Sequence, residues 1–196
     1  MRGSVPDYGA QRRIGFRAAV TSSSLETGVT WGALQYQFGT RESLLIEVLN
    51  DRWALLEDAV AHADIRGTTL EERLAEVLAV LARYYGQPEH LAQVQILLDL
   101  SQHPGTSAET RRAVAAHGQK LIQAWQPLFA HALGDAAGEE DLVRYAFSAL
   151  RGYLVGHLIA SSIADGFDDS AERQLLIAGV SAAIRAEAGR RGLTEL

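Results

Sequence analysis

Apolar residues recur at the three- and four-residue spacing of α-helices over most of this 196-residue chain. No segment shows the strict alternation that is typical of a half-buried β-strand, and glycine and proline interrupt the pattern at intervals. The pattern predicts an all-α protein. We expect helices over residues 10–20, 40–64, 68–86, 88–102, 107–133, 139–164 and 170–188, with the helix over 88–102 central because it is dense in apolar residues.

Residues at the expected helix ends support these boundaries. Thr40 and Ser107 should cap the helices that follow them, because a hydroxyl oxygen accepts a hydrogen bond from an unpaired backbone N–H of the first turn. Thr68 and Glu71 predict a capping box at the start of another helix. Pro127 lies inside a predicted helix, where the missing N–H should kink the axis.

Charge is divided unevenly along the chain. Residues 1–45 hold five basic and three acidic side chains, a net charge of +2, and the remainder holds 13 basic and 21 acidic side chains, a net charge of −8. A weakly basic head on an acidic body suits a small DNA-reading domain joined to a domain that does not bind DNA. An acidic protein with a solvated arginine cluster is the alternative that the charges leave open.

Several classes of protein are disfavoured by the composition. There is no cysteine, so there is neither a disulfide nor a cysteine-ligated metal. The six histidines show no tight ligand spacing, and no phosphate loop, HExxH or nucleophile elbow occurs, so we expect no metal, no cofactor and no enzyme. No apolar run reaches the roughly 18 residues of a membrane span, and the N-terminus lacks the apolar core of a signal peptide. These features favour a cytoplasmic protein without membrane contact.

The segment from Gly28 to Leu45, GVTWGALQYQFGTRESLL, predicts a short helix, a break at Gly39 and the start of a long helix. Arg41 lies in the first turn of that long helix, where a cation is favoured if an anion also binds there. The residues that carry the pattern are Gly28, Val29, Thr30, Gly32, Leu34, Phe38, Arg41 and Leu44. In these residues the segment resembles the recognition helix and following helix of the TetR family of transcriptional regulators.

This resemblance implies a helix-turn-helix DNA-binding domain over 1–45 and a helical effector-binding and dimerisation domain over 46–196. It implies a dimeric regulator, usually a repressor, that binds operator DNA and is released by a small molecule. Thr30, Gln37 and Arg41 match family positions that mostly hold phosphates, and Gln35 is expected to pair with an adenine edge. The candidate DNA-binding residues are Arg12, Arg13, Thr30, Trp31, Gln35, Tyr36, Gln37 and Arg41.

One segment departs from the family pattern. Between the first helix and the Gly28 motif only residues 21–27, TSSSLET, are available for the scaffold helix. At a rise of about 1.5 Å per residue they form at most about two turns, and serine prefers caps and turns to helix interiors. A shortened head leaves open a second interpretation, in which the protein is a helical ligand-binding homodimer that has lost DNA binding.

Small residues form a stripe with a four-residue period along the predicted helix 139–164, and helix 170–188 repeats the theme. Glycine inside a helix costs about 1 kcal/mol relative to alanine, so close packing is the reason we infer for it. We expect both helices to pair with the same helices of a second chain, with burial inside one chain as the alternative. The candidate dimer-interface residues are Ser148, Gly152, Gly156, Ala160, Gly179 and Ala183.

An effector pocket among the body helices follows from the resemblance. Such pockets are mostly apolar with a few placed polar groups, and the helix with Pro127 is expected to form one wall. Each candidate also suits an ordinary core. The candidate pocket residues are Trp53, Tyr84, Tyr85, His103, Trp125, Phe129 and Phe147.

Overall fold

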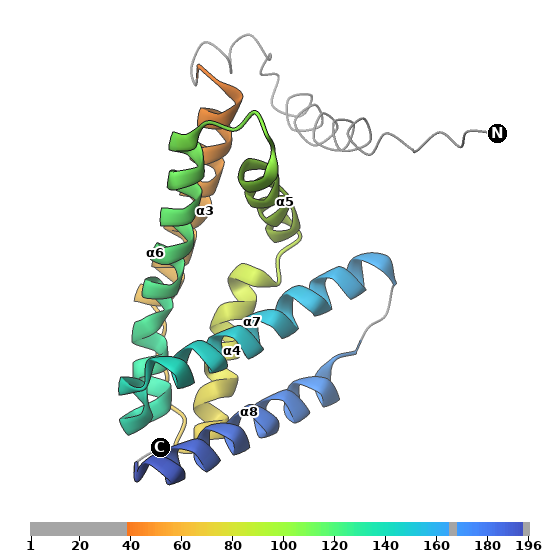
Figure 1. Cartoon of the computed structure of the whole chain (residues 1–196). Helices are drawn as coiled ribbons and strands as arrows, with labels where there is room; N and C mark the ends of the chain where they lie inside the picture. The colour runs from red at the N-terminus through yellow and green to blue at the C-terminus, as the bar shows by residue number, and fades with distance from the viewer. Residues whose placement is uncertain (1–38, 165–167, 194–196) are drawn as a thin grey trace, which may run out of the picture. The chain divides into compact units, whose positions relative to one another are not determined.

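The structure is a computed structural model that describes residues 39–164 and 168–193 (Figure 1). Within these ranges the chain forms α-helices, one 3-10 helix and no β-strand, which confirms the all-α prediction for this part of the chain. The predicted helix over 10–20 and the segment 21–38 lie outside the described residues. The elements are α3 (Arg41–Ala61), α4 (Leu70–Tyr85), α5 (Glu89–Gln102), α6 (Ala108–Leu133), η1 (Gly134–Gly138), α7 (Glu140–Ile163) and α8 (Ser170–Arg191).

Contacts between Cα atoms divide the chain into two units, Met1–Leu45 and Ile46–Leu196. The structure describes only residues 39–45 of the first unit, so the helix-turn-helix domain remains a prediction. The end of that unit contains the predicted break and cap. Gly39 has a φ of 71°, in the left-handed region that glycine adopts most easily. The Oγ1 of Thr40 accepts a hydrogen bond of 3.1 Å from the backbone N–H of Ser43.

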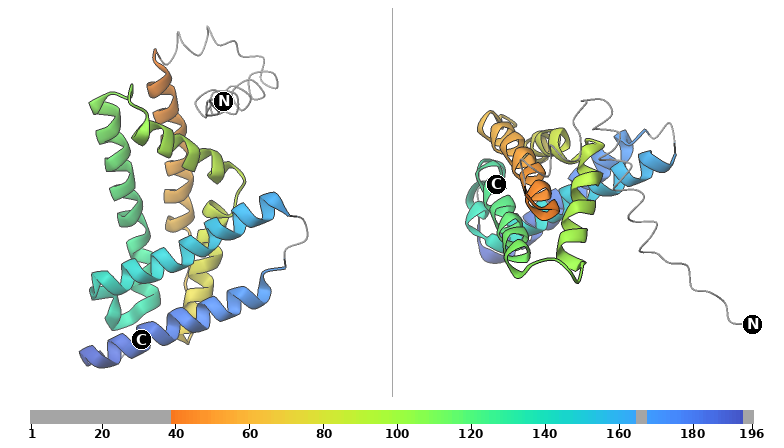
Figure 2. Two further views of the ribbon diagram at one scale, coloured as in Figure 1. Left: turned by 45° about the vertical axis from the view of Figure 1, so that its right-hand side comes forward. Right: turned by 90° about the horizontal axis from the view of Figure 1, so that it is seen from above.

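The core of the second unit is built around α4. Its apolar face is buried, and the buried surface extends to Tyr84 and Tyr85 at the end of the helix. α4 contacts α6, α7 and α8, and both side views show α7 and α8 crossing it (Figures 1 and 2). Because burial of one Leu or Val side chain stabilises a fold by about 1.5–3 kcal/mol, this face holds four helices together.

Polar contacts join the ends of these helices. The Nε–H of Arg73 in α4 donates a hydrogen bond of 2.9 Å to the carbonyl oxygen of Ala132 in α6. Arg185 of α8 forms an ion pair with Glu71 of α4. Exposed ion pairs contribute little free energy, so these contacts mainly fix the register of helices that apolar packing brings together.

The start of α4 differs by one residue from the prediction. The capping box is formed by Thr69 and Glu72, with the backbone N–H of Glu72 donating to the Thr69 hydroxyl at 3.2 Å. The prediction of Thr68 and Glu71 was therefore wrong. The sequence TTLEE allows both pairings, and burial of Leu70 as the first helical residue selects the later one. At α6 the predicted cap is confirmed, because the Ser107 hydroxyl accepts from the N–H of Thr110 at 3.1 Å.

The expectation that the helix over 88–102 is central was wrong. The buried residues of α5 are His90, Gln93 and Leu100, whereas Leu98 is 49% exposed. Apolar density along this segment does not form one face, so the helix cannot bury all of its apolar residues at once. No helix in the described ranges is long and apolar enough to cross a membrane.

The capping box yields a first prediction. Thr69→Ala should lower the free energy of unfolding by about 1 kcal/mol, because the N–H of Glu72 loses its acceptor. Ser101→Ala is a suitable control, since this exposed hydroxyl donates to a carbonyl of its own helix rather than accepting at a helix start. Chemical denaturation followed by circular dichroism measures both values. Equal stability of Thr69→Ala and the unsubstituted protein would contradict the capping assignment.

Candidate functional site

An aromatic cluster lies where α4 ends. The ring centroids of Tyr84 and Tyr85 are 5.0 Å apart and the rings are nearly perpendicular. Trp125 of α6 lies 5.6 Å from Tyr85, and Phe147 of α7 lies 6.2 Å from both Trp125 and Phe129. All five rings are buried. The structure therefore brings five of the seven candidate pocket residues together, as rings that pack on one another within the core.

The other two candidate pocket residues lie elsewhere. Trp53 of α3 is half-buried, and its ring meets the edge of His117 at a centroid distance of 5.6 Å. His103 is exposed just after α5, where its Nδ1 accepts a hydrogen bond of 3.0 Å from the N–H of Gly105. Trp53 packs against the edge of the buried core, whereas His103 is exposed, so a shared pocket for all seven residues stays a prediction.

A chain of hydrogen bonds crosses the buried cluster. The indole N–H of Trp125 donates to the Tyr85 hydroxyl at 2.9 Å. The amide nitrogen of Gln93 donates to the Tyr84 hydroxyl at 2.6 Å, which leaves its amide oxygen 3.1 Å from Nδ1 of His90. Because that oxygen can only accept, Nδ1 of His90 carries the proton and Nε2 is an acceptor. Nε2 is buried and has no hydrogen-bond partner among the described residues.

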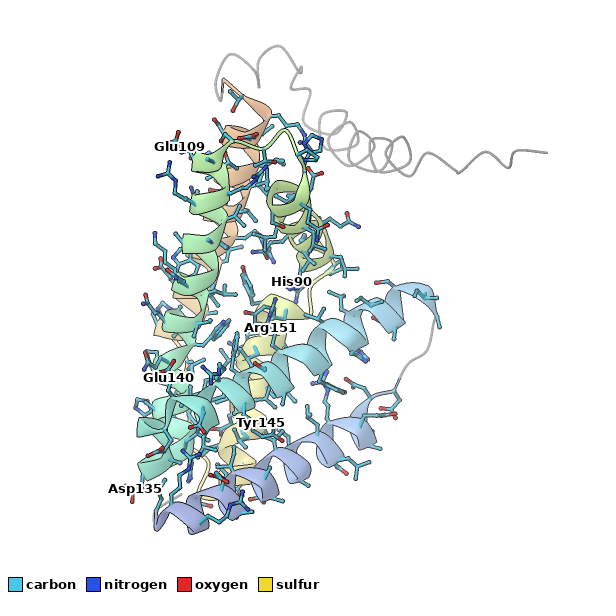
Figure 3. The ribbon with its side chains drawn as sticks, in the orientation of Figure 1. His90, Glu109, Asp135, Glu140, Tyr145 and Arg151 are labelled. Carbon is cyan, nitrogen blue, oxygen red and sulfur yellow. The ribbon has the colours of Figure 1, made fainter. Side chains whose placement is uncertain are left out.

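Two arginines contact this cluster from helices that are far apart in the sequence. The Cζ of Arg52 in α3 lies 5.5 Å from the centroid of the Tyr84 ring, and the Cζ of Arg151 in α7 lies 5.4 Å from that of Tyr85. Figure 3 shows Arg151 and His90 side by side, at the junction of α4, α5 and α7. The Nε atoms of both arginines are buried and have no hydrogen-bond partner within the described part of the chain.

The electrostatics of the cluster are unbalanced. Burial, with a smaller contribution from the two guanidinium charges, lowers the pKa of His90 to about 4. Burial also raises the pKa of both tyrosines, so the only charges in the cluster at neutral pH are the two guanidiniums. Neither Arg52 nor Arg151 forms an ion pair with a described Asp or Glu. A buried N–H without an acceptor costs about 1–3 kcal/mol of folding free energy. A bound anion or other acceptor would remove this cost, so the cluster favours such a ligand.

Sequence reasoning missed the polar members of this cluster. His90 and Gln93 stand three residues apart on one face of α5, and Arg151 interrupts the apolar sequence of α7. The available signal was a polar side chain at a position that the helical period assigns to the core. That signal is weak from sequence alone, because a long arginine side chain usually reaches solvent from such a position.

The candidate interface residues are exposed rather than buried in the chain's own core. Gly152, Gly156 and Gly179 are exposed, and a Cβ atom built on any of them meets nothing within 4 Å. Ser148 and Ala183 are exposed as well, and Ala160 is half-buried. Burial within the described chain therefore does not account for these glycines. On the opposite side of α7 the leucines are buried: Leu150, Leu154 and Leu158.

A separate groove of about 290 Å³ lies between α7 and α8. The Tyr153 hydroxyl donates to Oδ2 of Asp169 at 2.8 Å inside it, and Arg173 donates to the same oxygen at 2.7 Å. These two donors satisfy the same oxygen of the Asp169 carboxylate. The lining residues of the groove are Tyr153, Gly156, His157, Ala160, Asp169 and Glu172.

Most candidate DNA-binding residues lie outside the described residues, namely Arg12, Arg13, Thr30, Trp31, Gln35, Tyr36 and Gln37. Arg41 is described and is the exposed first residue of α3. No group of three or more His, Asp or Glu side chains in the described ranges could hold a metal ion. Comparisons with protein-family models, curated proteins and solved structures found no match.

The buried histidine predicts a pH dependence of stability. The pKa of His90 is about 6.5 in the unfolded chain and about 4 in the folded protein. Between these two pH values the His90 ring binds a proton in the unfolded chain but not in the folded one. Stability therefore falls as the pH is lowered through this window, by about 2 kcal/mol between pH 7 and pH 5. His90→Gln should remove most of this loss, whereas the exposed His131→Gln control should keep it. Urea denaturation at the two pH values measures this loss of stability. If an NMR titration showed that the His90 ring titrates near its usual pKa, the prediction would be contradicted.

Proposed function

We propose that the protein is a dimeric transcriptional regulator similar to the TetR family, a repressor that leaves its operator when a small molecule binds the second domain. The observation that carries this proposal is the Gly28–Leu45 motif. The structure describes the end of this motif. The left-handed Gly39 and the capping Thr40 lie where the motif requires a break and the start of a new helix, and this supports the proposal.

Arg41 supports the DNA-binding part of the proposal. It is exposed in the first turn of α3, beside the N–H groups at the start of that helix. A helix N-terminus has a partial positive charge, and together with an arginine it favours an anion such as a DNA phosphate. Phosphate contacts of this kind position a protein on DNA, while residues in the preceding helix read the bases.

The exposed sides of α7 and α8 support the homodimer. On α7 two exposed glycines share a stripe with Ile159 and Ile163, which are 46% and 82% exposed. On α8 Leu175 is 74% exposed and is followed by a run of small residues. In a two-fold dimer the same surface of each protomer packs against its copy. A second copy of this chain therefore buries the apolar residues, and the glycines allow the helices to approach closely.

The second candidate function is a helical ligand-binding homodimer without DNA binding. It is favoured by the seven residues available for the scaffold helix, 21–27. Both candidates share the dimer and the ligand, and they differ only in affinity for duplex DNA. Lengthening the 21–27 segment to a full helix should restore DNA binding under this second candidate and is unnecessary under the first.

DNA binding is tested with the full chain and labelled fragments from upstream of its own gene. Arg41→Ala should weaken binding to every sequence and reduce the salt slope by about one, because one phosphate contact is lost. Gln35→Ala should instead cost about 1–3 kcal/mol at one A·T pair. Arg83→Ala, an exposed arginine of α4, is the control that should change neither. Absence of binding at roughly 50 mM salt, where electrostatic affinity is strong, would reject the regulator.

The dimer is tested by two opposite effects of one substitution. Gly152→Leu should raise the helix stability of the protomer by up to about 1 kcal/mol, and should weaken dimerisation at least tenfold because the side chain blocks close approach. Gly118→Leu is a matched control, since Gly118 is also exposed inside a helix with nothing within 4 Å of its Cβ position. Analytical ultracentrifugation measures the dimer, and unchanged dimerisation of Gly152→Leu would reject this interface.

A further inference from the structure

We propose that Arg52, Arg151 and His90 form the binding site for a small organic anion that also carries a hydrogen-bond donor, such as a hydroxycarboxylate. As the effector site of a regulator, this inference rests on the proposed function. As a ligand site it rests only on the second unit of the chain, to which all three residues belong.

Three polar side chains converge beside the two tyrosines. The two guanidiniums lie over neighbouring rings, Arg52 over Tyr84 and Arg151 over Tyr85, and those rings are only 5.0 Å apart. His90 contacts both rings, at centroid distances of 5.7 Å and 4.8 Å. Residues from α3, α5 and α7 therefore meet at one place, and α4 supplies the surface between them.

The positive charges of Arg52 and Arg151 have no described carboxylate beside them. Other arginines at the contacts between described elements have a carboxylate or carbonyl acceptor, as Arg173 has Asp169, Arg185 has Glu71 and Arg73 has Ala132. Arg52 has the face of Tyr84 instead, and Arg151 has the ring and the hydroxyl of Tyr85, while each arginine keeps a buried Nε–H without an acceptor. An aromatic face attracts a cation but cannot accept from the N–H in the guanidinium plane. A carboxylate can, and its two oxygens match the donors of a guanidinium.

His90 makes the site selective for a ligand that carries a donor. Nε2 of His90 is a buried acceptor, because Nδ1 carries the proton toward Gln93. A carboxylate oxygen placed against this lone pair would be repelled, whereas a hydroxyl or N–H of the ligand would bind it. The site therefore favours a molecule that offers an anion to the arginines and a donor to the histidine. It disfavours a simple carboxylate without a donor, because His90 would stay unpaired.

A purely structural role for the two arginines makes a different prediction. If they only cover the tyrosine rings, replacing either one removes a favourable contact and lowers the melting temperature. If they are kept for an anion, replacing one removes a positive charge that no described carboxylate pairs in the ligand-free protein. Arg52→Gln and Arg151→Gln should then leave the melting temperature unchanged or raise it, as is common where a site is built at the expense of stability.

Binding is measured by calorimetry on the full chain without DNA, so the result does not depend on operator binding. The probes are two hydroxycarboxylates of different size, glycolate and 4-hydroxybenzoate, with their neutral amides and with acetate and benzoate. We expect at least one hydroxycarboxylate to bind, its amide and its hydroxyl-free partner to bind at least about tenfold more weakly, and Arg52→Gln and Arg151→Gln each to lose about tenfold or more. Arg83→Gln, the exposed control, should bind like the unsubstituted protein.

Three results would overturn the inference: no binding of any anion, affinities that the two substitutions leave unchanged, or a fall in melting temperature for both substituted proteins without ligand. A separate arm adds the bound hydroxycarboxylate to a protein–DNA complex. If the anion bound without releasing DNA, the anion site would be supported and its role as the effector site would be rejected. If a compound released DNA and its affinity did not depend on Arg52 or Arg151, the regulator function would be supported and the proposed anion site would be rejected.

Discussion

Burial of one face of α4 is the constraint on which the described structure depends. That face packs against α6, α7 and α8, and it ends in Tyr84 and Tyr85, which continue the apolar surface as an aromatic one. The same helix therefore holds the core together and supplies the floor of the candidate site. Because the tyrosine hydroxyls are buried, each needs a partner, and Trp125 and Gln93 provide it. The hydrogen bonds are thus a consequence of extending the core to the end of the helix.

The candidate site is costly to the ligand-free protein. His90 is buried and neutral, Arg52 and Arg151 are half-buried, and one nitrogen atom of each is buried without a partner among the described residues. A molecule that satisfies them adds its binding free energy to the stability of the folded state. This is the ordinary thermodynamic route by which a ligand shifts a conformational equilibrium, since only differential binding can do so.

α7 links the two proposed activities of the body. One side of this helix is buried in the protomer through Leu150, Leu154 and Leu158, and the other presents the exposed glycines. Arg151 of the candidate site and Gly152 of the candidate interface are consecutive residues. Under the proposed function, an anion that repositions Arg151 acts on the helix that joins the two protomers, and this is where ligand binding and the spacing of two DNA-binding heads would be coupled.

The helical elements of the described chain could be predicted without a structure, because the apolar period, the caps and the glycine and proline breaks are local signals. Thr40 and Ser107 cap where they were expected to, whereas the TTLEE segment offered two registers and only the burial of Leu70 chose between them. The aromatic rings could be predicted as a group, but not their polar partners. Whether Arg52 and Arg151 reach solvent or turn toward the tyrosines depends on how α3, α5 and α7 meet, and contacts between distant segments are decided by tertiary packing.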